Sequence, residues 1–182
     1  MYTAEVEIEG IVPMKQNKVS ESYGQSEELS PVKTEESVEK EWKSRAYQNE
    51  AGFYIPVQQL QATILAGLSA PKPLVSNKVK IFKKTAKACI FVNGDAQMTN
   101  GKLPLTYTKD INFVPTPTGL ATLIRPMFKE GWKAKFTVAC VEDWLTPKTL
   151  EEGIKRAGKC HGIGSHRPLF GRFIVNSFKI LT

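Results

Sequence analysis

The sequence predicts an α+β fold in which the elements follow one another as strand, helix, strand, strand, helix, strand. Three observations lead to this order. The segment 2–12 alternates apolar and polar side chains, as a strand with one buried face does. The segments 56–68 and 147–157 repeat apolar side chains at the spacing of a helix. Short, extended apolar segments lie between and after these two helices.

The first strand is predicted from its alternation. One face would carry Tyr2, Ala4, Val6 and Ile8, and the other Thr3, Glu5, Glu7 and Glu9. An apolar face opposite an acidic one is typical of a strand that covers a core on one side and meets water on the other. Gly10 and Pro13 end the pattern.

A polar, acidic segment follows over residues 15–44, and it is poor in large apolar side chains. Such a segment cannot bury enough apolar surface to offset the entropy that it loses on ordering. We therefore expect residues 15–44 to form a long, flexible insertion after the first strand.

The first helix is expected over 56–68, with Pro56 in its first turn. Its apolar stripe consists of Leu60, Ile64, Leu65 and Leu68. The segment 70–118 lacks a sustained period, but it has strand character near 88–92 and a tight turn at Asn93-Gly94-Asp95. We interpret 70–118 as a second insertion that carries short strands of its own.

The last third of the chain has a sharper pattern. The segments 120–128 and 132–141 flank Lys129-Glu130-Gly131, which predicts a hairpin. Trp132, Ala134, Phe136, Val138 and Cys140 would share the inner face of its second arm.

A second helix is expected from Thr146 as N-cap and Pro147 as its first residue, with Gly158 just past its end. The segment 172–181 predicts the last strand. The whole order is the ferredoxin-like, or RRM-like, βαββαβ arrangement with an antiparallel sheet. We expect one such domain over residues 1–182, with large insertions after the first strand and the first helix.

The charge of the chain is divided unevenly. Residues 1–50 carry six Lys or Arg and eleven Asp or Glu, a net −5, whereas residues 51–182 carry nineteen and seven, a net +12. A body of that charge attracts polyanions over a distance of about 8 Å or more, the Debye length at physiological salt. No segment approaches eighteen uncharged apolar residues, so we expect no membrane partner. The N-terminus does not have the pattern of a secretory signal.

The cysteines and histidines are too few and too scattered for a metal site or a disulfide framework. The three cysteines are Cys89, Cys140 and Cys160, and no CxxC or HxxxH spacing connects them with the two histidines. An odd number of cysteines fits reduced thiols and a cytoplasmic location. We therefore expect no metal and no cofactor.

The segment "GKCHGIGSHRPLFGRF", residues 158–173, holds both histidines and several glycines and basic side chains. It could bind phosphate through backbone N–H groups and basic side chains, hold a metal, house a catalytic histidine, or simply form a tight connection. Neither GxxxxGK[ST] nor a helix-opening GxGxxG is present. We favour a surface for nucleic acid, with the histidines as contacts instead of catalysts.

Several stretches resemble the RAMP superfamily of CRISPR-associated RNA-binding proteins, in particular the backbone subunits that assemble along guide RNA. These stretches are "VEIEGIVPM", "GFYIPVQQLQATIL" and "HGIGSHRPLFGRFIV". The chain is also similar to phage-encoded proteins of this shape in "IRP", "AG", "GIG", "RP" and "GRF" and in Trp132. The resemblance implies an RRM-like fold, a host-cytoplasm location if the protein is phage-encoded, and binding of a single strand across the sheet and the glycine-rich loop. Gln58, Gln59 and Gln61 stand where such proteins often have small polar and basic residues.

We expect the chain to bind RNA or single-stranded DNA without strong sequence preference and to assemble into homo-oligomers along the strand. The candidate binding residues are Lys159, His161, Gly162, Gly164, Ser165, His166, Arg167 and Arg172 of the loop, Arg125, Lys133 and Lys135 of the hairpin, and Lys43 and Arg45 before the first helix. Trp42 could clamp the strand or plug the core.

Two other functions stay open. One is a RAMP-type endoribonuclease that uses His161 or His166 as acid and base. The other is an assembly protein whose acidic arm, Glu21 to Glu41, docks on the basic body of a neighbour. No catalytic residue is assigned.

Overall fold

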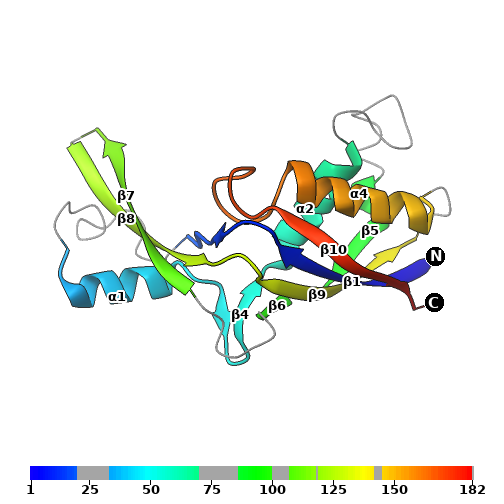
Figure 1. Ribbon diagram of the computed structural model, residues 1–182, viewed down its shortest axis with the longest axis horizontal. Helices are drawn as coiled ribbons and strands as arrows, with labels where there is room; N and C mark the ends of the chain where they lie inside the picture. Colours follow the sequence, from blue (N-terminus) through cyan, green and yellow to red (C-terminus); the bar gives the residue numbers. More distant parts are fainter. Residues whose placement is uncertain (20–32, 70–85, 100–106, 118, 142–144, 182) are drawn as a thin grey trace.

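The computed structural model of the protein describes residues 1–19, 33–69, 86–99, 107–117, 119–141 and 145–181 (Figure 1). The strands are β1 (Tyr2–Gly10), β2 (Met14–Lys15), β3 (Gln48–Asn49), β4 (Gly52–Ile55), β5 (Ile90–Asn93), β6 (Ala96–Thr99), β7 (Tyr107–Thr116), β8 (Gly119–Phe128), β9 (Lys133–Cys140) and β10 (Phe173–Ile180). The helices are α1 (Glu35–Ser44), α2 (Val57–Ser69) and α4 (Pro147–Cys160).

The main sheet has the strand order β10-β1-β9-β6-β4-β3, and β5 also pairs with β9. Every pair in it is antiparallel. Helices α2 and α4 pack against each other on one side of this sheet, and both termini lie at the same end of it (Figure 1). The α+β class is confirmed, and the arrangement is consistent with an RRM-like fold.

Strand β1 has the two faces that its alternation predicts. Ala4, Val6 and Ile8 are fully buried in the core, while the glutamates between them are part-exposed. On β9, the inner face also holds as predicted, because every second residue from Trp132 to Cys140 is buried. Alternation identifies these faces because successive strand side chains point to opposite sides of the sheet.

The turn predicted at Asn93-Gly94-Asp95 does not reverse the chain. Strands β5 and β6 flank it, yet both pair antiparallel with β9 on the same side: Asn93 lies opposite Thr137, and Met98 lies opposite Ala134. Gly94 has a φ of 73°, so this point is a kink inside one long strand path. The segment predicted as a second insertion therefore supplies two strands that belong to the main sheet.

The prediction that 120–128 and 132–141 pair as a hairpin is wrong. Strand β8 pairs with β7 over its whole length and with β2 at its end, in a separate three-stranded sheet. The chain does turn at Lys129-Glu130-Gly131, but the Gly131 N–H donates to Gly10 O, which directs β9 toward β1. The β7–β8 hairpin extends away from the main sheet (Figure 1).

Helix α1 packs against this second sheet. The Ile124 N–H donates to Glu41 Oε1 (3.1 Å), and the Trp42 ring lies 4.5 Å from the ring of Tyr107. Trp42 is 3% exposed, so it fills the core beside β7. Residues 35–44 of the expected flexible insertion are thus helical, while residues 20–32 lie outside the described residues.

Helices α2 and α4 begin as predicted, after Pro56 and after the Thr146 cap, whose Oγ1 accepts from Thr149 N–H. Gly158, however, does not end α4, which runs on to Cys160. A Cβ at Gly158 would collide with the Phe173 carbonyl oxygen and ring, so this glycine lets α4 approach β10. None of the helices in the described parts of the chain combines the length and apolar composition that a bilayer crossing needs.

Candidate nucleic-acid interface

The glycine-rich loop, residues 161–172, connects α4 to β10 and docks on the segment that follows β1. The Ser165 N–H donates to Lys15 O (2.8 Å), and the Gly171 N–H donates to Pro13 O (2.8 Å). Ile163 is fully buried beneath the loop. The loop is therefore held by backbone hydrogen bonds to residues far away in sequence, and its shape is fixed by the fold.

The structure shows why the loop needs its glycines. Gly162, Gly164 and Gly171 all have a positive φ. A Cβ on Gly164 would lie 2.5 Å from Lys15 O, and one on Gly171 would collide with Ile163 O. The space that these residues leave is filled by backbone of this chain, so the glycines allow the loop to pack closely.

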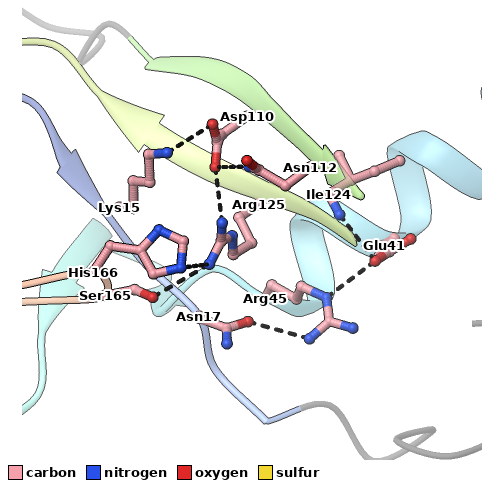
Figure 2. A network of polar contacts seen from close by, with 10 residues as sticks. All are labelled: Lys15, Asn17, Glu41, Arg45, Asp110, Asn112, Ile124, Arg125, Ser165 and His166. Carbon is pink, nitrogen blue, oxygen red and sulfur yellow. Dashed lines mark hydrogen bonds and ion pairs between the residues drawn. The ribbon is translucent and has the colours of Figure 1, made fainter. Parts of the chain in front are cut away.

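A cluster of four charged or titratable side chains joins the loop to the second sheet (Figure 2), and we call it the polar cluster: Lys15, Asp110, Arg125 and His166. Asp110 accepts from Lys15 Nζ (2.8 Å) and from Arg125 Nη2 (3.1 Å). The Arg125 Nη1 lies 3.4 Å from Ser165 Oγ and 3.3 Å from His166 Nε2. Arg125 is 2% exposed and Lys15 5%, so both cations belong to the interior.

The polar cluster explains the electrostatics of His166. His166 is exposed as a whole, but partial desolvation of its ring lowers its pKa below the usual value; the charges of Arg125 and Lys15 lower it further, while Asp110 partly opposes them. The His166 backbone has a φ of 58°, a left-handed conformation that is uncommon for a residue with a Cβ. The loop thus presents a histidine that stays neutral near pH 7.

An open pocket of about 560 Å³ lies between α2 and the glycine-rich loop. It is lined by Ala62, Ala66, Cys160, His161, Gly164, His166, Arg167 and Pro168. No carboxylate is among these lining residues. A second pocket of about 560 Å³ shares Ala62 and Ala66 and continues past Gln61 to Lys87. Together the two pockets cross the exposed side of α2.

The structure brings together part of the predicted loop set. His161, Gly164, His166 and Arg167 line one pocket. Lys159 is exposed on the last turn of α4, directly before them. Ser165 faces Arg125. Arg172 is half-buried, and its buried Nε has no hydrogen-bond partner among the described residues.

Lys133 and Lys135 lie apart from this pocket, on the sheet face opposite the helices. Their ammonium groups lie 3.4 Å from Glu9 and 2.9 Å from Glu5, respectively. The central strand β1 carries Glu5, Glu7 and Glu9 on that face. The exposed sheet face therefore carries both positive and negative charges, and the glutamates at its centre repel a polyanion.

Lys43 and Arg45 lie in and just after α1, not on the loop. The Arg45 Nε donates to Glu41 Oε1 (3.2 Å), its Nη1 donates to Asn17 Oδ1 (3.2 Å), and the side chain is 4% exposed. Arg45 thus holds α1 in place. Lys43 is exposed and pairs with Glu39, whose pKa falls to about 2, mainly through hydrogen bonds from Lys109 and Trp42.

The described residues hold no group of three or more His, Cys, Asp or Glu side chains placed to bind a metal ion. The three cysteines are thiols; Cys89 and Cys140 are buried, and Cys160 is exposed at the pocket.

Lys15, Asp110 and Gln61 are site residues that the sequence did not reveal. Lys15 and Asp110 fall in segments that we expected to be insertions, and only the docking of the loop and the β7–β8 hairpin brings them together. The Gln61 amide donates to Ile90 O and accepts from Val92 N–H (3.0 Å), so it caps the outer edge of β5. A helical glutamine facing a strand edge has no sequence signature.

Solved structures resemble this fold although their sequences differ from it. One is a chain of the Type III-B Cmr-beta complex bound to cognate target RNA, with a TM-score of 0.62 and 11% identity; the match covers 98% of this chain and 60% of that one. Another is Cmr6 from Pyrococcus furiosus, with a TM-score of 0.50 and 12% identity, covering 96% and 99% of the two chains. The present chain thus spans about three fifths of the first similar structure.

The likeness extends over nearly the whole chain, and it concerns the fold alone. No protein-family model matches the sequence, and no curated protein matches it. At 11% and 12% identity, the two similar structures share their fold with this chain.

Proposed function

We propose that this protein binds single-stranded RNA along the groove between α2 and the glycine-rich loop. The observation that carries the proposal is the pocket lined by His161, His166 and Arg167 with no carboxylate. Lys159 and the charge of +12 on residues 51–182 add attraction for phosphates. The likeness to a Cmr chain whose complex was solved with target RNA supports RNA as the strand.

The loop groove is the better of the two candidate surfaces. On the sheet face, Lys133 and Lys135 already pair with glutamates, so a phosphate there would compete with carboxylates. At the loop, Arg167 and Lys159 are exposed, and neither forms a salt bridge with another of the described residues. Release of counterions from the strand would then supply most of the affinity, without sequence preference.

The test is a salt titration of binding to a fluorescently labelled single-stranded RNA, repeated with a DNA strand of the same sequence. The double variant K159A/R167A should lower the affinity about tenfold or more and flatten the dependence on salt, because two phosphate contacts are lost. The control K135A removes a basic side chain that is 60% exposed on the sheet face, and it should bind as the parent does. Equal losses in both variants, or binding that ignores salt, would sink the proposal.

Side-by-side assembly along the strand is a second part of this proposal. It follows from a binding mode without sequence preference, in which copies can occupy neighbouring stretches of one strand. Sedimentation of the protein with RNA strands of increasing length should show one added copy per fixed increment of length. A single copy on every strand would count against assembly. Gel electrophoresis of the same mixtures detects RNA cleavage, which the alternative function as an endoribonuclease requires.

A further inference from the structure

The contact between Arg125 and His166 fixes which nitrogen of the histidine carries the proton. The two groups approach at 3.3 Å, from Arg125 Nη1 to His166 Nε2. A guanidinium only donates hydrogen bonds and keeps its proton in proteins, so the imidazole nitrogen facing it must accept. An accepting Nε2 leaves the proton of the neutral ring on Nδ1.

The groups around the ring keep this state. Arg125 of β8 and Lys15 of β2 are buried cations beside it, and Asp110 of β7 is shared between them. The Phe170 ring packs near the imidazole, with centroids 6.4 Å apart, and Lys15 Nζ lies over that ring at 4.0 Å. A second proton on His166 would remove the acceptor of Arg125 and place a third positive charge in the cluster. The lowered pKa of His166 agrees with this arrangement.

The second ring nitrogen is directed elsewhere. Figure 2 shows the Nδ1 side of His166 pointing away from the Arg125 guanidinium. The residue is exposed and lines the pocket next to Arg167. Among the described residues, none takes a hydrogen bond from this nitrogen. The backbone of His166 is left-handed, with a φ of 58°.

We propose that neutral His166 donates its Nδ1–H to a phosphate oxygen of the bound strand, and that Arg125 is the positioning residue that fixes this tautomer. The inference rests on the proposed function and deepens it, because it names the donor atom and the acceptor group. A phosphate is favoured over a base because Arg167 puts a positive charge beside His166 in a pocket without a lining carboxylate, and that charge attracts an anionic group more than a neutral one. His166 would then bind the strand as a neutral donor, without gaining a charge of its own.

The first test needs no nucleic acid. The chain has only two histidines, so nitrogen-15 NMR of the protein and of H161Q assigns the His166 ring unambiguously. We expect an unprotonated Nε2, a protonated Nδ1 and a titration midpoint below that of free histidine, about 6.5. A ring protonated on Nε2, or a midpoint above that of free histidine, overturns the inference even if RNA binds.

The second test compares two amides at one position. In H166N the side-chain amide can occupy the place of Nδ1, whereas in H166Q it reaches the place of Nε2. We expect H166N to keep RNA affinity within about threefold and H166Q to lose about tenfold, the effect of one hydrogen bond to a charged group. Because asparagine tolerates a left-handed backbone, H166G serves as the control that relieves the backbone and lacks the donor. Loss in H166Q but not in H166G, or equal loss in H166N and H166Q, contradicts the inference.

The acceptor is identified with modified strands. The ratio between the parent and H166Q affinities should shrink on a methylphosphonate strand, whose one remaining non-bridging oxygen is an uncharged and weaker acceptor, and persist in full on an abasic strand. The opposite pattern would assign the acceptor to a base and overturn the phosphate. If no strand binds at any salt concentration, the proposed function fails, while the NMR measurement still decides the tautomer.

Discussion

Arg125 of β8 and Asp110 of β7 form an ion pair inside the protein, with 3.1 Å between Nη2 and Oδ2 and side-chain exposures of 2% and 14%. The same carboxylate holds Lys15, so one anion compensates two buried cations. This relationship joins the β7–β8 hairpin, the segment after β1 and the glycine-rich loop.

Replacing Asp110 with asparagine should therefore destabilise the protein strongly. D110N leaves Lys15 and Arg125 buried without their anion, and breaking one side of a buried pair costs about 3–5 kcal/mol. The control is E151Q, which breaks the exposed pair of Glu151 with Lys155 on α4 and should change stability by less than about 1 kcal/mol. Urea unfolding of both variants measures the difference. Similar midpoints for the two would show that the cluster is not a structural link.

A second prediction concerns the close packing of the loop. G164A and G94A both place a Cβ at a positive φ, which costs about 1–2 kcal/mol. At Gly94 nothing lies within 4 Å of the new atom, whereas at Gly164 it would meet Lys15 O at 2.5 Å. We expect G164A to lower the free energy of unfolding clearly more than G94A. Thermal unfolding compares the two variants. An equal loss of stability would mean that the loop moves away from Lys15 without a further loss of free energy.

Gln61 gives a third prediction, about the edge of β5. In Q61A the Val92 N–H and the Ile90 carbonyl lose their side-chain partner. The change should cost about 1–3 kcal/mol, since a buried backbone group is left unpaired. Amide hydrogen exchange should show faster exchange at Val92. The neighbouring glutamine variant Q58A, on an exposed position of the same helix, is the control; faster exchange there too would point to a general loosening of α2.

The fourth prediction is that the stability of the protein depends on pH because His166 titrates. Its pKa in the folded protein is lowered, chiefly by burial and then by Arg125 and Lys15. Below about pH 6.5 the unfolded chain takes up this proton before the folded protein does. Stability should thus be complete above about pH 6.5 and fall as the pH drops from there toward the folded pKa.

The pH effect is measured by urea unfolding at intervals between about pH 5 and pH 8. In H166N this part of the loss should disappear, because the titrating ring is gone. Carboxylates in the protein titrate lower, so H166N separates the two contributions. A variant whose stability still falls between about pH 6.5 and pH 5.5 as in the parent would place the titration on another group.

The sequence determined those features that depend on local period and composition. The inner faces of β1 and β9, the starts of α2 and α4 and the α+β class follow from where apolar side chains recur, because burial must match the geometry of each element. The glycine-rich segment was recognised as a special connection, and several of its residues do line one pocket. These features are fixed by neighbours within a few residues.

The tertiary structure decided what pairs with what. Strand β8 is close in sequence to both β7 and β9, and it pairs with β7. The sequence did not choose between these two neighbours, since either antiparallel partner satisfies the hydrogen bonds of the strand equally well. For the same reason, β5 and β6 pair with β9, although they come from the segment 70–118 that we expected to be an insertion. Burial also divided the basic residues: Arg45 and Arg125 became interior ion-pair partners, while Lys159 and Arg167 stayed exposed. A charge in a sequence does not reveal whether an anion of the same chain will meet it, because that depends on residues brought together only when the chain folds.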